Sequence, residues 1–233
     1  MEPSKYQLRL EEGEKAREQE DYALALKSFD QAIIEGVELD DPILILNALA
    51  QKLLVYKHMF QKTTNPVYNL LMLGDAQTGL KIAEEKKVTG QPKAVMLLRS
   101  GDYFFWKKDY ATAQTLYEEA VLNVDQEKKG EYAEYLSHLG ICQALNGNKT
   151  GLENLNKALT LASEDNTLRP FHKLVIVSGI HMRLAMANKK FGDTDKAIKE
   201  YETATTMAEE LASVHKMPMR LKQLEIVAKE LGI

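Results

Sequence analysis

Two short segments of this 233-residue chain carry side chains that suit binding. Arg99–Trp106, RSGDYFFW, brings together a cation, a carboxylate, aromatic rings and the only tryptophan. His181–Met186, HMRLAM, places two methionines and an arginine within about one turn of a helix. Aromatic and arginine side chains are enriched at protein-binding hot spots, and methionine adapts its shape to a partner. These residue types predict recognition of a protein or peptide.

The residues that usually signal catalysis or metal binding lack the required spacing. The five histidines include no H-x3-H pair and no neighbouring carboxylate set with ligand spacing. Cys142 stands alone in an apolar run, where it is expected to be a small buried hydrophobe. Gly147–Thr150, GNKT, lacks the full G-x4-G-K-[ST] pattern of a phosphate loop. We therefore expect no catalytic residues, no metal site and no cofactor.

The composition indicates an all-α protein of the cytoplasm. Gly and Pro are sparse, at 13 and 6, while strong helix formers dominate. The net charge of -4 argues against non-specific binding to nucleic acid, which requires Lys and Arg to neutralise phosphates. No run of about 18 apolar residues occurs, so no membrane span is expected. The first 20 residues also lack the apolar core of a secretory signal.

A repeated pair of amphipathic helices must position the two binding segments. The pattern has a glycine in the first helix, a Gly/Asp-Tyr type of turn, and the trio A-x3-[F/Y]-x2-A in the second helix. Spacings of four and three put the trio on one helix face, where small residues allow close approach and the aromatic ring fills the gap. Three good trios and two degraded ones are Ala25/Phe29/Ala32, Ala113/Tyr117/Ala120, Ala197/Tyr201/Ala204, Ala76/Leu80/Ala83 and Gly151/Leu155/Ala158.

This pattern resembles the tetratricopeptide repeat. The trios begin at residues 25, 76, 113, 151 and 197, so every interval exceeds the family period of about 34 residues. The large aromatic residue of the family's first helix is replaced by Arg9, Leu97 and His181 in the three good copies. The resemblance implies a right-handed superhelix whose first helices line a concave surface, where the family usually binds its partners.

We therefore predict an all-α, right-handed α-solenoid of about five antiparallel hairpins and a C-terminal capping helix, in a single repeat domain over residues 1–233. In the last helix, leucines form one apolar stripe, and Arg220 is expected to face away from it. The expected hairpins cover about 5–37, 42–88, 93–125, 128–163 and 168–215, and the cap covers 218–231.

The concave groove implied by the resemblance gives the candidate partner-binding residues. First-helix side chains that alternate with the packing positions should face it: Arg99, Asp102, Phe105, Trp106, His138, Met182, Arg183 and Met186. Some tetratricopeptide domains hold the C-terminal carboxylate of heat-shock chaperones with a Lys/Asn/Lys/Arg set. Here the matching places are mostly Leu10, Glu14, Leu98 and Asp102, with Arg183 the only comparable cation, so that clamp is not supported.

The leading functional hypothesis is a non-enzymatic scaffold that binds a peptide or a partner helix in this groove. Two alternatives belong to other classes. The chain could be a peptide-sensing regulatory domain of a bacterial signalling protein, because peptide-pheromone receptors contain similar helical repeats. It could also be a structural subunit of a larger assembly that binds through a convex or end face.

Overall fold

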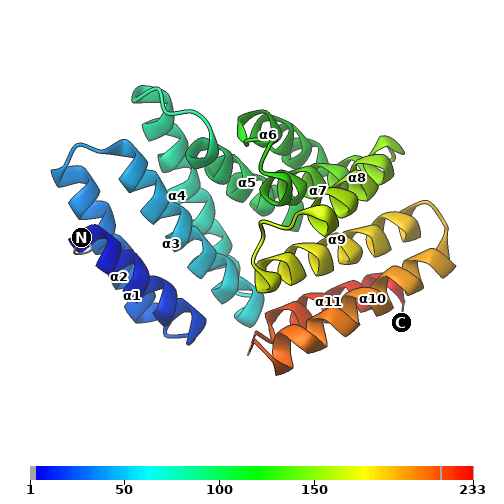
Figure 1. Cartoon of the computed structure of the whole chain (residues 1–233). Helices are drawn as coiled ribbons and strands as arrows, with labels where there is room; N and C mark the ends of the chain where they lie inside the picture. The colour runs from blue at the N-terminus through cyan, green and yellow to red at the C-terminus, as the bar shows by residue number, and fades with distance from the viewer. Residues whose placement is uncertain (1–3, 216, 233) are drawn as a thin grey trace. The chain divides into compact units, whose positions relative to one another are not determined.

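The computed structural model describes residues 4–215 and 217–232, and every regular element in these ranges is an α-helix (Figure 1). The chain forms two compact units, Met1–Tyr103 (unit 1) and Phe104–Ile233 (unit 2). The boundary between them falls inside one helix, α5. The predicted all-α helical-repeat class is confirmed, whereas the right-handed twist and the five-hairpin count stay predictions. No helix in the described ranges is long and apolar enough to span a bilayer.

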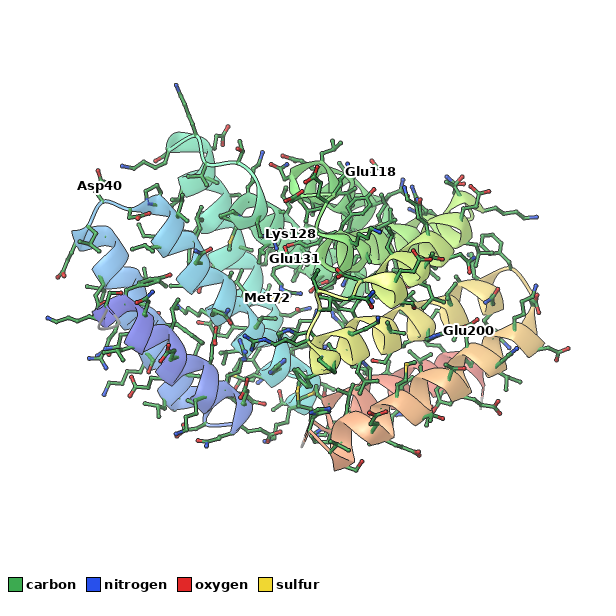
Figure 2. The ribbon with its side chains drawn as sticks, viewed as in Figure 1. Asp40, Met72, Glu118, Lys128, Glu131 and Glu200 are labelled. Atoms are coloured by element: carbon green, nitrogen blue, oxygen red, sulfur yellow. The ribbon has the colours of Figure 1, made fainter. Side chains whose placement is uncertain are left out.

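Unit 1 contains four complete helices and most of a fifth. Consecutive helices α1 to α4 pack against one another along the chain (Figure 1). The core between α3, α4 and α5 is built from Leu46, Leu53, Met72 and Met96, all fully or almost fully buried; Met72 is labelled in Figure 2. The helices are α1 (Lys5–Glu18), α2 (Tyr22–Glu38), α3 (Pro42–Thr63), α4 (Pro66–Glu85) and α5 (Gln91–Trp106).

Unit 2 begins with the last turn of α5 and continues with six helices. Helix α7 packs against α6, α8 and α9, and α11 packs against both α9 and α10. The last helix covers apolar surface, because Val227 and Leu231 bury themselves against Ala185 and Ala197. The helices are α6 (Tyr110–Asn123), α7 (Lys129–Leu145), α8 (Thr150–Glu164), α9 (Pro170–Lys190), α10 (Thr194–Ser213) and α11 (Met219–Leu231).

The predicted trio residues pack as their spacing indicates. Ala25, Phe29 and Ala32 are all fully buried on α2. A Cβ atom added at Gly13 of α1 would lie 2.5 Å from the ring of Phe29, so the first-helix glycine makes room for the aromatic residue of the trio. Ala113, Tyr117 and Ala120 are likewise fully buried on α6. The repeated pattern is therefore a packing device between the two helices of a hairpin.

The fourth trio departs from the pattern for a steric reason. Gly151 occupies the place of the first alanine, and a Cβ there would lie 2.4 Å from both the backbone nitrogen of Ala144 and the carbonyl oxygen of Gly140. Backbone atoms cannot move aside as a flexible side chain can, so even alanine is too large. Helices α7 and α8 approach closely enough to require glycine, and the departure from the pattern reflects tighter packing.

Aspartates at the predicted turns act as helix N-caps. Asp21, Asp109 and Asp193 each accept a hydrogen bond from the backbone N–H three residues later, at 3.1, 3.1 and 3.2 Å. Each carboxylate satisfies an N–H group that has no partner within its helix. The residue before each cap has a positive φ, at 60° for Glu20, 61° for Lys108 and 84° for Gly192. One left-handed residue and one acidic cap therefore define the tight turn.

Candidate binding surface on the first helices

In unit 1, a buried carboxylate joins α5 to α3. Arg99 and Asp102 lie one turn apart on α5, and Arg99 Nη1 donates to Asp102 Oδ2 at 2.8 Å. Lys57 Nζ on α3 donates to the same oxygen, also at 2.8 Å. The exposed fractions of the Arg99 and Asp102 side chains are only 7% and 4%. The negative charge of Asp102 thus compensates two cations in an environment with little water, where charge pairs are strongly coupled.

Further polar side chains extend this arrangement across unit 1. Arg17 of α1 donates to the amide oxygen of Gln51 on α3. Burial lowers the pKa of His58 on α3 to about 4, and the positive charges of Arg17, Lys57 and Arg99 lower it further. His58 is therefore neutral at pH 7. We call Arg17, Gln51, Lys57, His58, Arg99 and Asp102 the unit-1 cluster.

In unit 2, α9 carries an arginine that contacts a histidine of α7. Arg183 Nη2 lies 2.5 Å from His138 Nε2, and since the guanidinium can only donate, Nε2 accepts and the ring proton sits on Nδ1. His138 is buried, and its ring meets that of Tyr117 edge-on, with centroids 5.2 Å apart. The histidine is therefore held by packing on one side and by a charge-assisted hydrogen bond on the other.

A second arginine reaches the same place from α11. Arg220 Nη2 donates to the carbonyl oxygen of Val175 at 2.9 Å, and Nη1 donates to Gln223 Oε1 at 2.5 Å. Burial lowers the pKa of Arg220 to about 10, and the nearby charge of Arg183 adds to this, while Glu134 opposes it. The prediction that Arg220 faces away from the packed side of the last helix is wrong, because its hydrogen bond to Val175 directs it onto α9.

The guanidinium groups of Arg183 and Arg220 lie over one position of α9. A Cβ added at Gly179 would be 3.1 Å from Arg183 Nη1 and 3.1 Å from Arg220 Nη2. Both groups therefore occupy the space that a side chain at this position would need. We call Glu134, His138, Gly179, Arg183, Arg220 and Gln223 the unit-2 cluster.

The other predicted site residues lie in more apolar surroundings than the two charged clusters. Phe105 and Trp106 are half-buried at the end of α5; their rings meet edge-on, with centroids 6.3 Å apart, and Phe105 also contacts Tyr110 at 5.5 Å. Met182 and Met186 pack against the core shared by α9, α10 and α11. Packing therefore accounts for much of the surface of both methionines.

Of the predicted residues, the structure joins Arg99 with Asp102, Phe105 with Trp106, and His138 with Arg183. Lys57 and His58 were not predicted, because the second copy of the repeat is recognisable in the sequence only by its second helix. Their position on α3, the first helix of the predicted hairpin 42–88, was the available signal.

Among the described residues, no group of three or more His, Cys, Asp or Glu side chains could hold a metal ion.

A further pair belongs to the packing of one hairpin. His181 occupies the place of the family's large aromatic residue on α9, and its Nδ1 lies 2.5 Å from Glu200 Oε2 on α10. Figure 2 labels Glu200 on α10. A polar pair between the two helices thus replaces an aromatic contact at this position.

Solved structures with the same arrangement of helices are known. Rap protein, complexed with competence and sporulation factor, aligns with 97% of this chain at 18% identity and a TM-score of 0.69. BtubC of P. vanneervenii aligns with 86% of this chain and 78% of its own, at 16% identity and a TM-score of 0.62. A Podospora anserina kinesin light chain with nearly identical TPR-like repeats aligns with 93% of this chain and 100% of its own, at 13% identity and a TM-score of 0.59.

This chain has a tetratricopeptide-like fold. The tetratricopeptide-like chain spans 58% of the length of the Rap chain. No family model matches the sequence, and no curated protein matches it. The identities are low, so the likeness to these structures establishes the fold alone.

Proposed function

We propose that this tetratricopeptide-like protein is a non-enzymatic scaffold that binds a protein or peptide along its first helices. The observation that carries the proposal is the presence, in each unit, of a half-buried, hydrogen-bonded cation on a first helix: Lys57 in unit 1 and Arg183 in unit 2. Side chains fixed in this way lose little entropy when a partner binds, so they suit specific recognition. Such polar groups would set the orientation of the partner.

The proposed binding surface is the concave face of a single right-handed repeat domain over residues 1–233. Phe105 and Trp106 would supply apolar contact, since both are half-buried and large. Arg183 would supply a charged contact in the predicted groove. The scaffold would act in the cytoplasm, without a cofactor and without binding nucleic acid or membranes.

Affinity capture of partners from an extract of the source cells tests the scaffold. We expect the wild-type chain to retain a partner that Trp106→Ala and Arg183→Glu each lose. Lys27→Glu and Leu122→Ala are matched controls, because Lys27 is an exposed cation of α2, a second helix, and Leu122 is 80% exposed on α6. If the two groove variants bind normally while the control variants fail, the concave groove is not the binding face and the structural-subunit alternative is favoured.

A peptide-sensing regulatory domain is the second candidate. It is favoured by the alignment of Rap, a protein solved with competence and sporulation factor, over 97% of this chain. A sensor should bind a short peptide without any other protein present. Thermal unfolding in the presence of a synthetic peptide library would reveal this as a saturable rise in melting temperature. A captured protein partner without stabilisation by any peptide would favour the scaffold instead.

A further inference from the structure

We propose that the outward face of α4 in unit 1 is a dimer contact, on which a second copy of this chain packs around Val67, Leu70, Leu71 and Gly74. Helix α4 (Figure 1) is one of the five helices that carry a trio of the repeat, and the two alanines of its trio are buried. The proposed contact is therefore separate from the first-helix residues proposed for partner binding, and the inference does not depend on that function.

Three apolar side chains are exposed on one face of α4. The exposed fractions of Val67, Leu70 and Leu71 are 51%, 53% and 45%, and spacings of three and four residues place them on one side of the helix. No charged side chain among residues 63–78 is exposed, because Asp75 is half-buried and pairs with Lys52 at 3.1 Å. The first three turns of α4 therefore present an uncharged, largely apolar surface.

The four other helices that carry a trio differ from α4 in their exposed residues. Over its first twelve residues each of them exposes at least one charged side chain, as a surface helix ordinarily does. These exposed charged residues include Lys27 and Asp30 on α2, Glu118 on α6, Glu153 and Lys157 on α8, and Lys196 and Lys199 on α10. Monomeric proteins rarely expose contiguous apolar patches unless the patch has a binding role, so the exception on α4 indicates a contact surface.

Gly74 belongs to the same stripe, four residues after Leu70. A Cβ atom at this position would meet nothing within 4 Å, so no contact within the described chain requires glycine there. Glycine in the interior of a helix is unfavourable relative to alanine. An exposed glycine that its own chain does not require fits a place where another helix approaches closely.

The stripe is complementary to itself in an antiparallel arrangement. A two-fold axis midway between Leu70 and Leu71 gathers these leucines of both copies at the axis. The same axis places Val67 of each copy opposite Gly74 of the other, since both lie about 5 Å along the helix from that midpoint. The valine then fills the space that the glycine leaves open. Because a two-fold axis brings each nearby charge close to its own copy, the absence of exposed charge here favours a second copy as the occupant.

The polar groups at the borders of the stripe can be covered without loss of hydrogen bonds. Thr78 Oγ1 donates to the carbonyl oxygen of Gly74 at 3.0 Å, and Thr63 Oγ1 donates to that of Met59 at 2.7 Å. Polar groups bonded in this way tolerate burial.

The size of the stripe predicts a weak dimer. Val67 and Thr78 lie about 16 Å apart along the helix. One helix face of this length buries less than the roughly 800 Å² per partner of a standard stable interface. We therefore expect a Kd of about 100 µM and a dimer that forms only in concentrated solution.

Sedimentation equilibrium of the full chain tests the contact, at protein concentrations from about 10 µM to about 1 mM. We expect the average mass to rise from that of the 26.3 kDa monomer toward twice this value. Leu70→Glu places a charge at the two-fold axis and should weaken dimerisation at least about tenfold. Leu122→Glu is the matched control, because Leu122 is 80% exposed on α6, outside the stripe, and should leave dimerisation unchanged.

Gly74→Leu distinguishes the proposed contact from non-specific association. The substitution adds exposed apolar surface, so non-specific association would become stronger. In the proposed contact the new side chain collides with Val67 of the second copy, and we expect dimerisation at least about tenfold weaker. Circular dichroism would verify that each variant keeps its helices.

A wild-type chain that stays monomeric at about 1 mM overturns the proposal, as does a dimer that Leu70→Glu and Gly74→Leu leave unchanged. Should one of these variants fail to fold, the other decides by comparison with Leu122→Glu. Loss of a captured protein in Leu70→Glu, with no dimer of the wild type, would assign this face of α4 to a different partner. The scaffold proposal is tested separately, because Trp106→Ala and Arg183→Glu should dimerise as the wild type does.

Discussion

The two units arrange their charged side chains in different ways. In unit 1, Asp102 accepts hydrogen bonds from Lys57 and Arg99, so a buried carboxylate compensates the cations around it. In unit 2, the guanidinium groups of Arg183 and Arg220 meet over Gly179, where Arg183 contacts His138 and Arg220 donates to the carbonyl oxygen of Val175. The same fold thus contains one cluster centred on a buried carboxylate and one centred on two neighbouring guanidinium groups.

This difference predicts that the charged residues of unit 1 contribute mainly to stability and that Arg183 of unit 2 contributes mainly to recognition of a partner. A carboxylate paired with two buried cations resembles a structural ion cluster, whose removal is costly because the desolvated partners lose their counter-charge. The side chain of Arg183 is only half-buried, and a guanidinium group forms strong hydrogen bonds with the carboxylates of a partner. Arg99 and Asp102 should therefore matter chiefly for folding, and Arg183 chiefly for binding, although the sequence suggested all three for one binding surface.

Asp102→Asn should have the largest effect on stability. The substitution removes the negative charge that Lys57 and Arg99 share while keeping the size of the side chain. We expect the free energy of unfolding to fall by about 3–5 kcal/mol, measured by urea denaturation. Asp40→Asn provides the control, because Asp40, labelled in Figure 2, pairs with Lys86 at 2.8 Å on the open surface and should show no measurable change. If both substitutions lowered the free energy of unfolding equally, Asp102 would contribute no more to stability than a surface carboxylate, and the proposed structural role of the unit-1 cluster would be wrong.

His58→Gln should change how stability depends on pH. The native pKa of His58 is about 4, below the ordinary value of 6.5, so the unfolded chain binds the proton more readily. The contribution of His58 to stability is therefore complete above pH 6.5 and is lost as the pH falls toward 4. After allowance for solvent screening, this loss amounts to about 2 kcal/mol.

Urea denaturation at several pH values would measure this effect. The glutamine variant, which has no proton to gain in this range, should lose less stability on acidification than the wild type. Identical pH profiles of the two chains would mean that neither burial nor the nearby cations lower the pKa of His58.

Arg183→Gln should have the smallest effect on stability. Its guanidinium group is half-buried and glutamine can still donate to His138, so we expect a change of about 1 kcal/mol or less. Partner capture should nevertheless be reduced. A loss of stability as large as that of Asp102→Asn would assign Arg183 a structural role and weaken the contrast between the two clusters.

Local patterns in the sequence predicted most of the fold. Phe29 and its flanking alanines follow one helical period, and Asp21 stands at a turn where an acidic cap is favoured, so each needs only its near neighbours to be interpreted. The close approach at Gly151 could not be predicted, because the atoms that forbid a side chain belong to the preceding helix. The sequence showed only a departure from the pattern.

The candidate site was less predictable, since its contacts join distant residues. Lys57 and Asp102 are 45 residues apart, and Arg220 is equally far from Val175. A helical wheel places Arg220 beside the apolar stripe of α11 but cannot tell whether its long side chain enters water or bends onto α9. That choice depends on the distance between two helices, which no single-helix pattern contains.

The continuity of α5 across the boundary between the units has a practical consequence. Trp106, the only tryptophan, belongs to unit 2 although most of its helix belongs to unit 1. Its intrinsic fluorescence therefore reports on unit 2, while far-ultraviolet circular dichroism averages all helices. If the two signals change at different urea concentrations, the units unfold in separate steps; coincident curves would show that one continuous helix couples them into a single cooperative transition.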